Sequence, residues 1–277
     1  MKSLIRLAVA AVTLFLIYFA LNFSSLYERV KLDRSFPALS RYAFERTPQI
    51  VLLGSSMSFR LFEGYFKTPL RNLSIGGGSP ATGLSIISSY RSLPKIILVE
   101  TNILSRPIDI ALVDAFGNNP SEPFKWFRPA RGVISWAYYW IKFQSEAQNV
   151  LLLPRRQPAT YDISQSVNDT IKEYNGRDWL QIMRPNVEEL KRLVAALEAR
   201  GCHIVLFELP SAPGVRETEY VKAAHILAKE AFPDAGKWLA ILDDRSELRW
   251  IDASHMDERS AIIVAQQMDR YVALVSR

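Results

Sequence analysis

The feature that most constrains the fold is an apolar run at residues 50–53, Ile-Val-Leu-Leu, which ends in Gly54-Ser55-Ser56. Four large aliphatic residues in a row predict a strand that is buried on both faces, as in a parallel sheet covered by helices. A glycine after the strand permits a sharp turn, and open α/β sheets bind ligands at the carboxyl ends of their strands. Ser56 is therefore a candidate nucleophile, although Gly-Ser-Ser is also ordinary turn sequence.

Strand and helix patterns alternate along most of the remaining chain. We expect strands at 50–53, 71–75, 95–100 and 203–208, a weaker strand near 239–242, and helices at 81–92, 186–200, 217–231 and 258–275. This alternation predicts an α/β fold with a doubly wound, mostly parallel sheet flanked by helices. A chain of 277 residues with 49% hydrophobic content is long enough to bury one such core together with an anchor or an insertion.

A nucleophilic serine needs a base, and the chain has only three histidines. We expect His203 at the edge of a strand and His225 on the face of a helix. His255 follows Asp252 by three residues, so the carboxylate can accept a hydrogen bond from the ring and fix its tautomer. Ser56, His255 and Asp252 therefore form a candidate hydrolytic triad, and the alternative is that Asp252 only caps the last helix.

Two of the motifs resemble the catalytic motifs of the SGNH, or GDSL-type, hydrolases. The nucleophile motif of that family, Gly-Asp-Ser-Leu, reads Gly-Ser-Ser-Met at residues 54–57, with Ser55 in place of the family's Asp. The resemblance assigns the nucleophile to Ser56. The last motif of the family, Asp-x-x-His, is met in full by Asp252 and His255.

A glycine motif lies between these two motifs. The family's Asn-x-Gly-x-x-Gly fits residues 72–79, Asn-Leu-Ser-Ile-Gly-Gly-Gly-Ser. The resemblance assigns an oxyanion-hole N–H to Gly77, with Gly76 and Gly78 as alternatives. A flexible turn is the other interpretation of the three glycines.

The family's third motif, Gly-x-Asn-Asp, stands as Glu-Thr-Asn-Ile at residues 100–103, where only Asn102 is retained. The resemblance implies that the side chain of Asn102 joins the N–H groups of Ser56 and Gly77 in an oxyanion hole. Removing one such donor typically lowers the rate by a factor of about 10² to 10³. The alternative role for Asn102 is a cap at the end of a strand.

The amino terminus has a basic start and an apolar centre. Lys2 and Arg6 precede an uncharged stretch at residues 7–23, which is at the short end of what spans a bilayer. No small-residue cleavage site follows, so an uncleaved transmembrane anchor over residues 1–23 is favoured over a signal peptide. A membrane-proximal linker at 24–48 and a catalytic domain at 49–277 would follow.

Two signals give opposite orientations for this anchor. Residues 24–49 carry five Lys or Arg residues against two ahead of the span, which by the positive-inside count places the main domain in the cytoplasm. The short basic leader resembles a secretory signal-anchor, after which a large domain can translocate despite its charge. We expect an extracytoplasmic domain, on the periplasmic or cell-surface side.

Residues 105–184 interrupt the alternation and are rich in aromatic residues. This insertion follows the strand that bears Asn102, so we expect it at the rim of the site, where insertions commonly set substrate choice. Aromatic faces suit sugar rings, and they equally suit a membrane interface or a partner protein. A small helical subdomain with its own core is the alternative.

Charge and composition bear on which classes of ligand and partner the chain is expected to bind. The formal charge is +6 and the pI near 9.4, but the basic residues form no stripe, so we expect no nucleic-acid partner. No His/Cys cluster has metal-ligand spacing, and we expect neither a metal nor another cofactor. The single Cys202 has no disulfide partner within the chain and is expected to be a buried structural thiol.

The resemblance implies a membrane-anchored esterase or O-acyltransferase that works through a Ser acyl-enzyme. The anchor favours O-acyl groups, acetyl or another short acyl, on a cell-envelope polysaccharide. Membrane-tethered family members serve alginate O-acetylation and D-alanylation of teichoic acids beside multi-span acyltransferases, which suggests such a partner. A non-catalytic, membrane-tethered binding or assembly subunit is the main alternative, and a lipase-like esterase for membrane lipids is a third.

Overall fold

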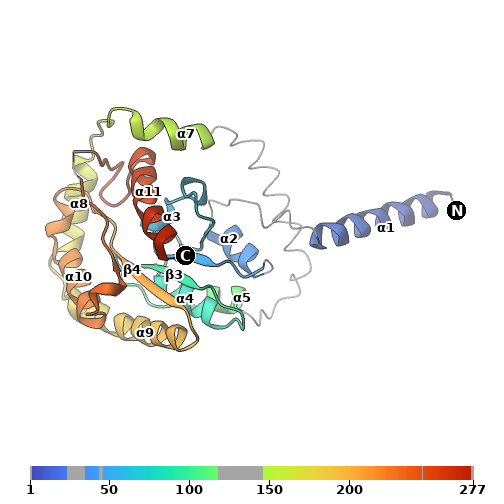
Figure 1. Cartoon of the computed structure of the whole chain (residues 1–277), viewed down its shortest axis with the longest axis horizontal. Helices are drawn as coiled ribbons and strands as arrows, with labels where there is room; N and C mark the ends of the chain where they lie inside the picture. The colour runs from blue at the N-terminus through green and yellow to red at the C-terminus, as the bar shows by residue number, and fades with distance from the viewer. Residues whose placement is uncertain (1, 24–34, 44–45, 118–145, 245, 276–277) are drawn as a thin grey trace.

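The computed structural model describes residues 2–23, 35–43, 46–117, 146–244 and 246–275 (Figure 1). Its centre is a five-stranded sheet with the order β2-β1-β3-β4-β5, in which every pair of neighbours is parallel. The strands are β1 (Ile50–Leu53), β2 (Arg71–Asn72), β3 (Ile96–Glu100), β4 (His203–Phe207) and β5 (Trp238–Leu239). The predicted α/β class and parallel sheet are confirmed, and the strand order reverses between β1 and β3, as in a doubly wound fold.

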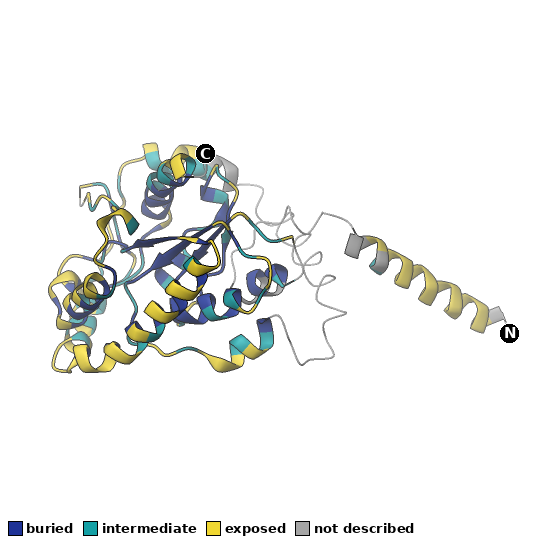
Figure 2. Ribbon diagram, turned by 60° about the horizontal axis from the view of Figure 1, so that its bottom comes forward, coloured by how far each residue is buried: buried dark blue, intermediate teal, exposed yellow. Residues whose placement is uncertain are grey.

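Helices cover both faces of this sheet, and Figure 2 shows the strands buried between them. One face packs against α2 (Ser35–Tyr42), α4 (Pro80–Ser88), α9 (Trp179–Ala199) and α10 (Glu219–Ala231), with α5 (Ile110–Phe116) at its edge. The other face packs against α3 (Ser56–Phe59) and α11 (Glu258–Val275). Successive residues of β1 alternate between the two faces, since Val51 and Leu53 join the first core and Ile50 and Leu52 the second. This explains the unbroken apolar run in the sequence.

The register of the strands brings their carboxyl ends to one edge of the sheet. Leu53 lies opposite Val99, and Val99 lies opposite Leu206. Beyond β2 the chain stays beside β1, because the N–H of Ile75 donates to the carbonyl of Gly54 at 2.9 Å. The turns that follow β1, β2 and β3 therefore meet at this edge.

The element boundaries differ from the prediction at two strands and at the helices. The strand predicted at 71–75 covers only Arg71–Asn72, and the one predicted near 239–242 lies at Trp238–Leu239. The helix predicted to begin at 186 begins at Trp179, with Pro185 inside it, and the helix predicted to end at 92 ends at Ser88. The remaining helical elements are α1 (Lys2–Phe23), α7 (Glu146–Leu152), α8 (Ser164–Tyr174) and the short 3-10 turns η2 (Glu63–Tyr65), η4 (Leu153–Arg155), η5 (Val215–Glu217) and η6 (Ala235–Lys237).

The insertion at 105–184 is described in part. Residues 118–145, which hold most of its aromatic side chains, lie outside the described residues. In the described part, Tyr174 stacks on Tyr220 with ring centroids 4.3 Å apart, and Trp179 meets Tyr220 edge-on at 4.7 Å. These rings join α8, α9 and α10, so they are used for packing.

The amino-terminal part was expected to hold a transmembrane helix over residues 1–23 and a linker over 24–48. Within the segment expected as a linker, 24–48, α2 packs on the sheet, with Ala38 and Leu39 buried. None of the helices in the described ranges has the length and apolar character needed to cross a membrane.

Candidate active site

Ser56, His255 and Asp252 form a continuous hydrogen-bonded chain, although 199 residues separate the serine from the histidine. His255 Nε2 lies 2.9 Å from Ser56 Oγ, and His255 Nδ1 lies 2.8 Å from Asp252 Oδ2. Nucleophile, base and orienting carboxylate are thus in the order that serine hydrolysis requires. The three residues predicted from the sequence are the three that the fold brings together.

A tight turn holds the histidine and the aspartate in this arrangement. Asp252 Oδ1 accepts hydrogen bonds from the N–H groups of Ser254, at 2.8 Å, and His255, at 2.7 Å. Helix α11 is capped by a different residue, Asp257, which accepts from the N–H of Ser260 at 2.8 Å. Asp252 therefore serves the histidine and does not cap the last helix.

The charge of Asp252 fits this role. Burial alone raises the pKa of its carboxyl, but the hydrogen bonds from the His255 ring and from the N–H groups of Ser254 and His255 outweigh burial and lower that pKa below its usual value. Asp252 is therefore ionised at neutral pH and can stabilise a protonated His255 ring during catalysis.

The nucleophile sits at the first position of α3, directly after the β1 turn. Ser55 is the N-cap of α3, and its Oγ accepts a hydrogen bond from the N–H of Met57 at 3.1 Å. Gly54 is required by close packing, because a Cβ there would lie 2.1 Å from Ser58 Oγ and 2.5 Å from Glu100 Oε2. This finding replaces the sequence-based explanation that the glycine serves to permit a sharp turn.

Gly77 lies in a turn whose shape requires a glycine. Its φ is +76°, and the N–H of Gly78 donates to the carbonyl of Ile75 at 2.8 Å, as expected when the third residue of a β-turn has positive φ. In the described part of the chain, no acceptor is bonded to the N–H of Gly77 or of Ser56. Both N–H groups are therefore free to bind an oxyanion.

Asn102 is held differently from the expectation. Its Nδ2 donates to the carbonyl of Leu209 at 2.8 Å, and its Oδ1 accepts from the N–H of Leu209 at 2.7 Å. This pair of bonds links the ends of β3 and β4, so Asn102 fills the role of strand-end cap. One hydrogen of its amide is left for a ligand.

Sequence reasoning missed two residues at this edge. Glu100, at the end of β3, is 1% exposed and accepts hydrogen bonds from Ser55 and Ser58. Arg106 is exposed, and its Nη1 would lie 3.0 Å from a Cβ at Gly77. Glu100 carried a signal, a charged residue at the end of an otherwise apolar strand, whereas Arg106 carried none.

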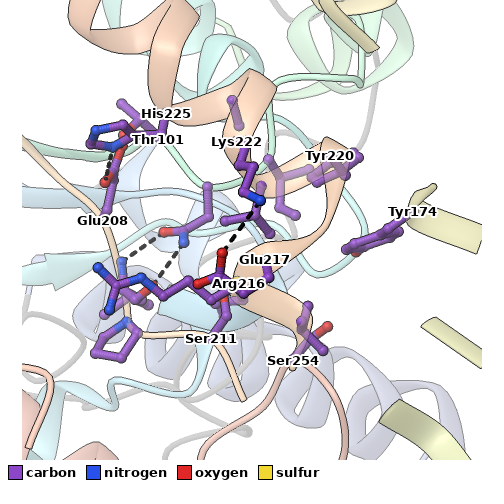
Figure 3. A pocket seen from close by; sticks show the side chains of 18 of the residues that line it. Thr101, Tyr174, Glu208, Ser211, Arg216, Glu217, Tyr220, Lys222, His225 and Ser254 are labelled. Carbon is purple, nitrogen blue, oxygen red and sulfur yellow. Dashed lines mark hydrogen bonds and ion pairs between the residues drawn. The ribbon is translucent and has the colours of Figure 1, made fainter. Parts of the chain in front are cut away.

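A hollow of about 390 Å³ lies beside the triad. Figure 3 shows side chains that line it, among them Ser254, the neighbour of His255. Met57, Asn102 and Ser254 line it, so it reaches the neighbours of Ser56 and His255. Its wall carries two ion pairs, Lys222 with Glu217 at 3.3 Å and Arg216 with Asp243 at 3.2 Å, and one hydrogen-bonded pair, His225 with Glu208 at 2.9 Å. As predicted, His225 lies on the face of a helix.

The other candidate reactive groups stand apart from this chemistry. Cys202 is buried, as predicted, and burial raises the pKa of its thiol. His203 is exposed at the start of β4, at the strand edge that the sequence predicted. Across the described ranges, no three His, Cys, Asp or Glu side chains are grouped as a metal ion would require.

Comparisons with protein-family models, with curated proteins and with solved structures gave no match. The case for an activity therefore rests on the geometry of Ser56, His255 and Asp252 and on the groups around them.

Proposed function

We propose that the protein is a serine-dependent acyl-ester hydrolase or O-acyltransferase of the SGNH type. The observation that carries this proposal is the hydrogen-bonded chain from Asp252 through His255 to Ser56, with distances of 2.8 and 2.9 Å. A core histidine that only satisfied its own hydrogen bonds would not need a serine at a helix start on one side and a turn-held carboxylate on the other.

The reaction follows from these positions. Ser56 Oγ attacks the carbonyl carbon of an ester while His255 Nε2 takes the hydroxyl proton, and Asp252 stabilises the charged ring. The negative charge that forms on the carbonyl oxygen is bound by the N–H groups of Ser56 and Gly77, joined by the remaining amide hydrogen of Asn102. His255 then gives its proton to the departing alcohol, which leaves an acyl ester on Ser56.

The second half of the reaction decides between hydrolase and transferase. Water, activated by His255, releases the acid, whereas a carbohydrate hydroxyl in the same place forms a new ester. Both outcomes use the same residues.

The hollow beside the triad favours a polar substrate. Among the apolar side chains of its wall lie two ion pairs and the hydrogen-bonded pair of His225 and Glu208. A long acyl chain that covered these polar groups would remove them from water without replacing their hydrogen bonds, which is costly. A ligand rich in hydroxyl groups can bond to the same carboxylates, guanidinium and ammonium. We therefore propose a short acyl group and a glycan as substrate, and we consider a membrane lipid the weaker candidate.

We further propose that the protein works at the cell envelope, attached to a membrane through the exposed apolar side chains of α1, with its catalytic domain on the extracytoplasmic side. The support is local: α1 exposes most of its apolar side chains, with Leu4 and Leu7 each 73% exposed. A multi-span membrane acyltransferase that supplies the acyl group is the partner this proposal implies.

The test uses the purified full-length protein with two ester classes. We expect acetate release from acetylated oligosaccharides, no cleavage of long-chain acyl esters, and no activity in Ser56→Ala. Transfer is tested with an isotopically labelled acetyl donor and an unlabelled oligosaccharide acceptor. Acetate release without any labelled acceptor contradicts the transferase half of the proposal, and activity on long-chain esters alone contradicts the glycan half.

A further inference from the structure

Two departures from the resembled motifs lie in contact with each other. Ser55 stands where the nucleophile motif has Asp, and Glu100 stands where the third motif has Gly. Because Leu53 of β1 lies opposite Val99 of β3, the next residues along each strand bring these two positions together. Ser55 Oγ donates to Glu100 Oε1 at 2.7 Å, and the N–H of Ser55 donates to Glu100 Oε2 at 3.0 Å.

Together the two side chains cap the helix that carries the nucleophile. Ser55 Oγ accepts from the N–H of Met57 at 3.1 Å, and Glu100 Oε2 accepts from the N–H of Ser58 at 3.1 Å. These are the second and third N–H groups of α3, the two that an N-cap side chain normally reaches. A single aspartate at position 55 could accept from both, so the serine and the glutamate divide between them what one carboxylate there can do.

Glu100 is a buried carboxylate that is held by hydrogen bonds. It is 1% exposed, and among the described residues its carboxylate pairs with no cation. Its hydrogen bonds with Ser55 and Ser58 offset the cost of removing a carboxylate from water. It also closes the space above Gly54, where a Cβ would lie 2.6 Å from Glu100 Cβ.

We infer that Glu100 is a positioning residue for the nucleophile, which supplies from β3 the carboxylate that the family motif places at position 55. The inference rests on the proposed function. Glu100 binds the residues before and after the Ser56–Met57 step, so it fixes the direction of Ser56 Oγ and of the Ser56 N–H. The two departures compensate for each other, and neither one counts as evidence of lost catalysis.

The test is a double-mutant cycle on the full-length protein, with Ser55→Asp, Glu100→Gly and the double variant. The readouts are the rate of covalent labelling by a fluorophosphonate, kcat and KM for a small acetyl ester, and the thermal midpoint. We expect Glu100→Gly to slow labelling by about 10- to 100-fold with KM little changed, because small displacements of reacting groups have effects of this size. Ser55→Asp alone should also be slow, since it places two carboxylates in contact.

The double variant carries one carboxylate at the motif position and should label within about threefold of wild type, which gives a strong coupling between the sites. If Glu100→Gly does not fold, Glu100→Gln replaces it. Its amide oxygen still accepts from the N–H groups of Ser55 and Ser58, but its NH2 group cannot accept the hydrogen bond that Ser55 Oγ donates to Glu100 Oε1. Glu100→Gln should label faster than Ser56→Ala and slower than wild type.

Different results overturn the inference and the function it rests on. The positioning role alone is overturned if Glu100→Gly or Glu100→Gln labels at the wild-type rate. It is also overturned if the double variant recovers its thermal midpoint but not its labelling rate. A folded wild type that never labels at Ser56 overturns the proposed function and the inference with it.

Discussion

Each oxygen of Asp252 has a separate task. Oδ2 faces the ring of His255, and Oδ1 binds the N–H groups of Ser254 and His255, so the carboxylate fixes the ring and the backbone that carries it. Because its folded-state pKa is lowered, Asp252 contributes stability that is fully present above its unfolded pKa of about 3.8 and is lost as the pH falls through the lower folded pKa. At neutral pH the charge beside His255 is therefore constant.

Asp252→Asn separates the two tasks. The amide oxygen can keep the turn, but the amide nitrogen cannot accept a hydrogen bond from the N–H at His255 Nδ1, so we expect kcat to fall by about 10² to 10⁴ at neutral pH. The control is Asp244→Asn, since Asp244 makes a similar turn with Ser246 and contacts no histidine. Equal kcat values for Asp252→Asn and wild type, measured on a short acetyl ester, would falsify the orienting role.

At this scale, sequence patterns predicted the residues whose signals are local. Ser56 ends a strand, and His255 follows Asp252 by three residues, so each could be recognised within one segment. The role of Glu100 depends on the pairing of β1 with β3 and could not be recognised that way. The tie between Asn102 and Leu209 likewise depends on the neighbouring strand.

The central element is the junction that runs from β1 through Gly54 into α3. The sheet fixes where β1 ends, and the packing of Glu100 and Ser58 over Gly54 fixes how α3 begins. Any side chain at Gly54 must push these groups apart.

Gly54→Ala should therefore lower the free energy of unfolding by about 1–3 kcal/mol, the usual cost of overpacking, and slow the labelling of Ser56. Gly76→Ala is the matched control, because a Cβ there meets no heavy atom within 4 Å and the φ of Gly76 is not positive. Urea unfolding of the two variants checks this. Equal stabilities would contradict the packing described for the junction.

The packing of Tyr220 against Tyr174 and Trp179 predicts how the free energy of unfolding changes at alkaline pH. Burial raises the pKa of Tyr220 to about 12, while an unfolded tyrosine ionises near 10. Between these values the unfolded chain loses a proton that the folded chain keeps, so stability falls as the pH rises, by up to about 1.4 kcal/mol per unit. Tyr220→Phe should show a shallower decline from pH 10 to 11 in urea unfolding, and identical slopes would count against this burial effect.

The bounds of the elements were predicted best where consecutive residues carry the same signal. β1 matches the predicted residues 50–53, because four buried aliphatics admit few other structures. The predicted start of α9 at residue 186 was wrong, because the helix begins at Trp179 and continues through Pro185, with Trp179 and Met183 packed in the core. The strand predicted at 71–75 is regular only over Arg71–Asn72, because the chain then turns towards the site.

At the scale of the whole molecule, the order of the strands determines where the site lies in the sheet. The cellular location of the protein is a separate question, which concerns the amino-terminal helix α1. The crevice where the strand order reverses, between β1 and β3, is where such sheets bind ligands, and there Glu100 binds Ser55 and Ser58, the residues on either side of the Ser56–Met57 step. Composition and alternation were enough to predict this architecture, whereas the membrane attachment that we propose would depend on α1 (Lys2–Phe23).

The proposed anchoring predicts how the full chain fractionates. Expressed in a bacterium, it should stay with the membranes after an alkaline carbonate wash, and protease added outside spheroplasts should digest residues 35–275. The same protease treatment after detergent lysis is the control for accessibility. If the protein washes off the membranes, the proposed anchor is contradicted. If it is protected from the protease until lysis, the proposed orientation is contradicted.

The most direct test of the central claim is covalent labelling of the folded full-length protein with a fluorophosphonate, read by mass spectrometry of the peptide that holds residues 54–60. We expect one adduct on Ser56, which is lost in Ser56→Ala and forms much more slowly in His255→Ala. The adduct should persist in variants of the exposed His203. An unlabelled wild type, or labelling that does not depend on Ser56, would contradict the central claim.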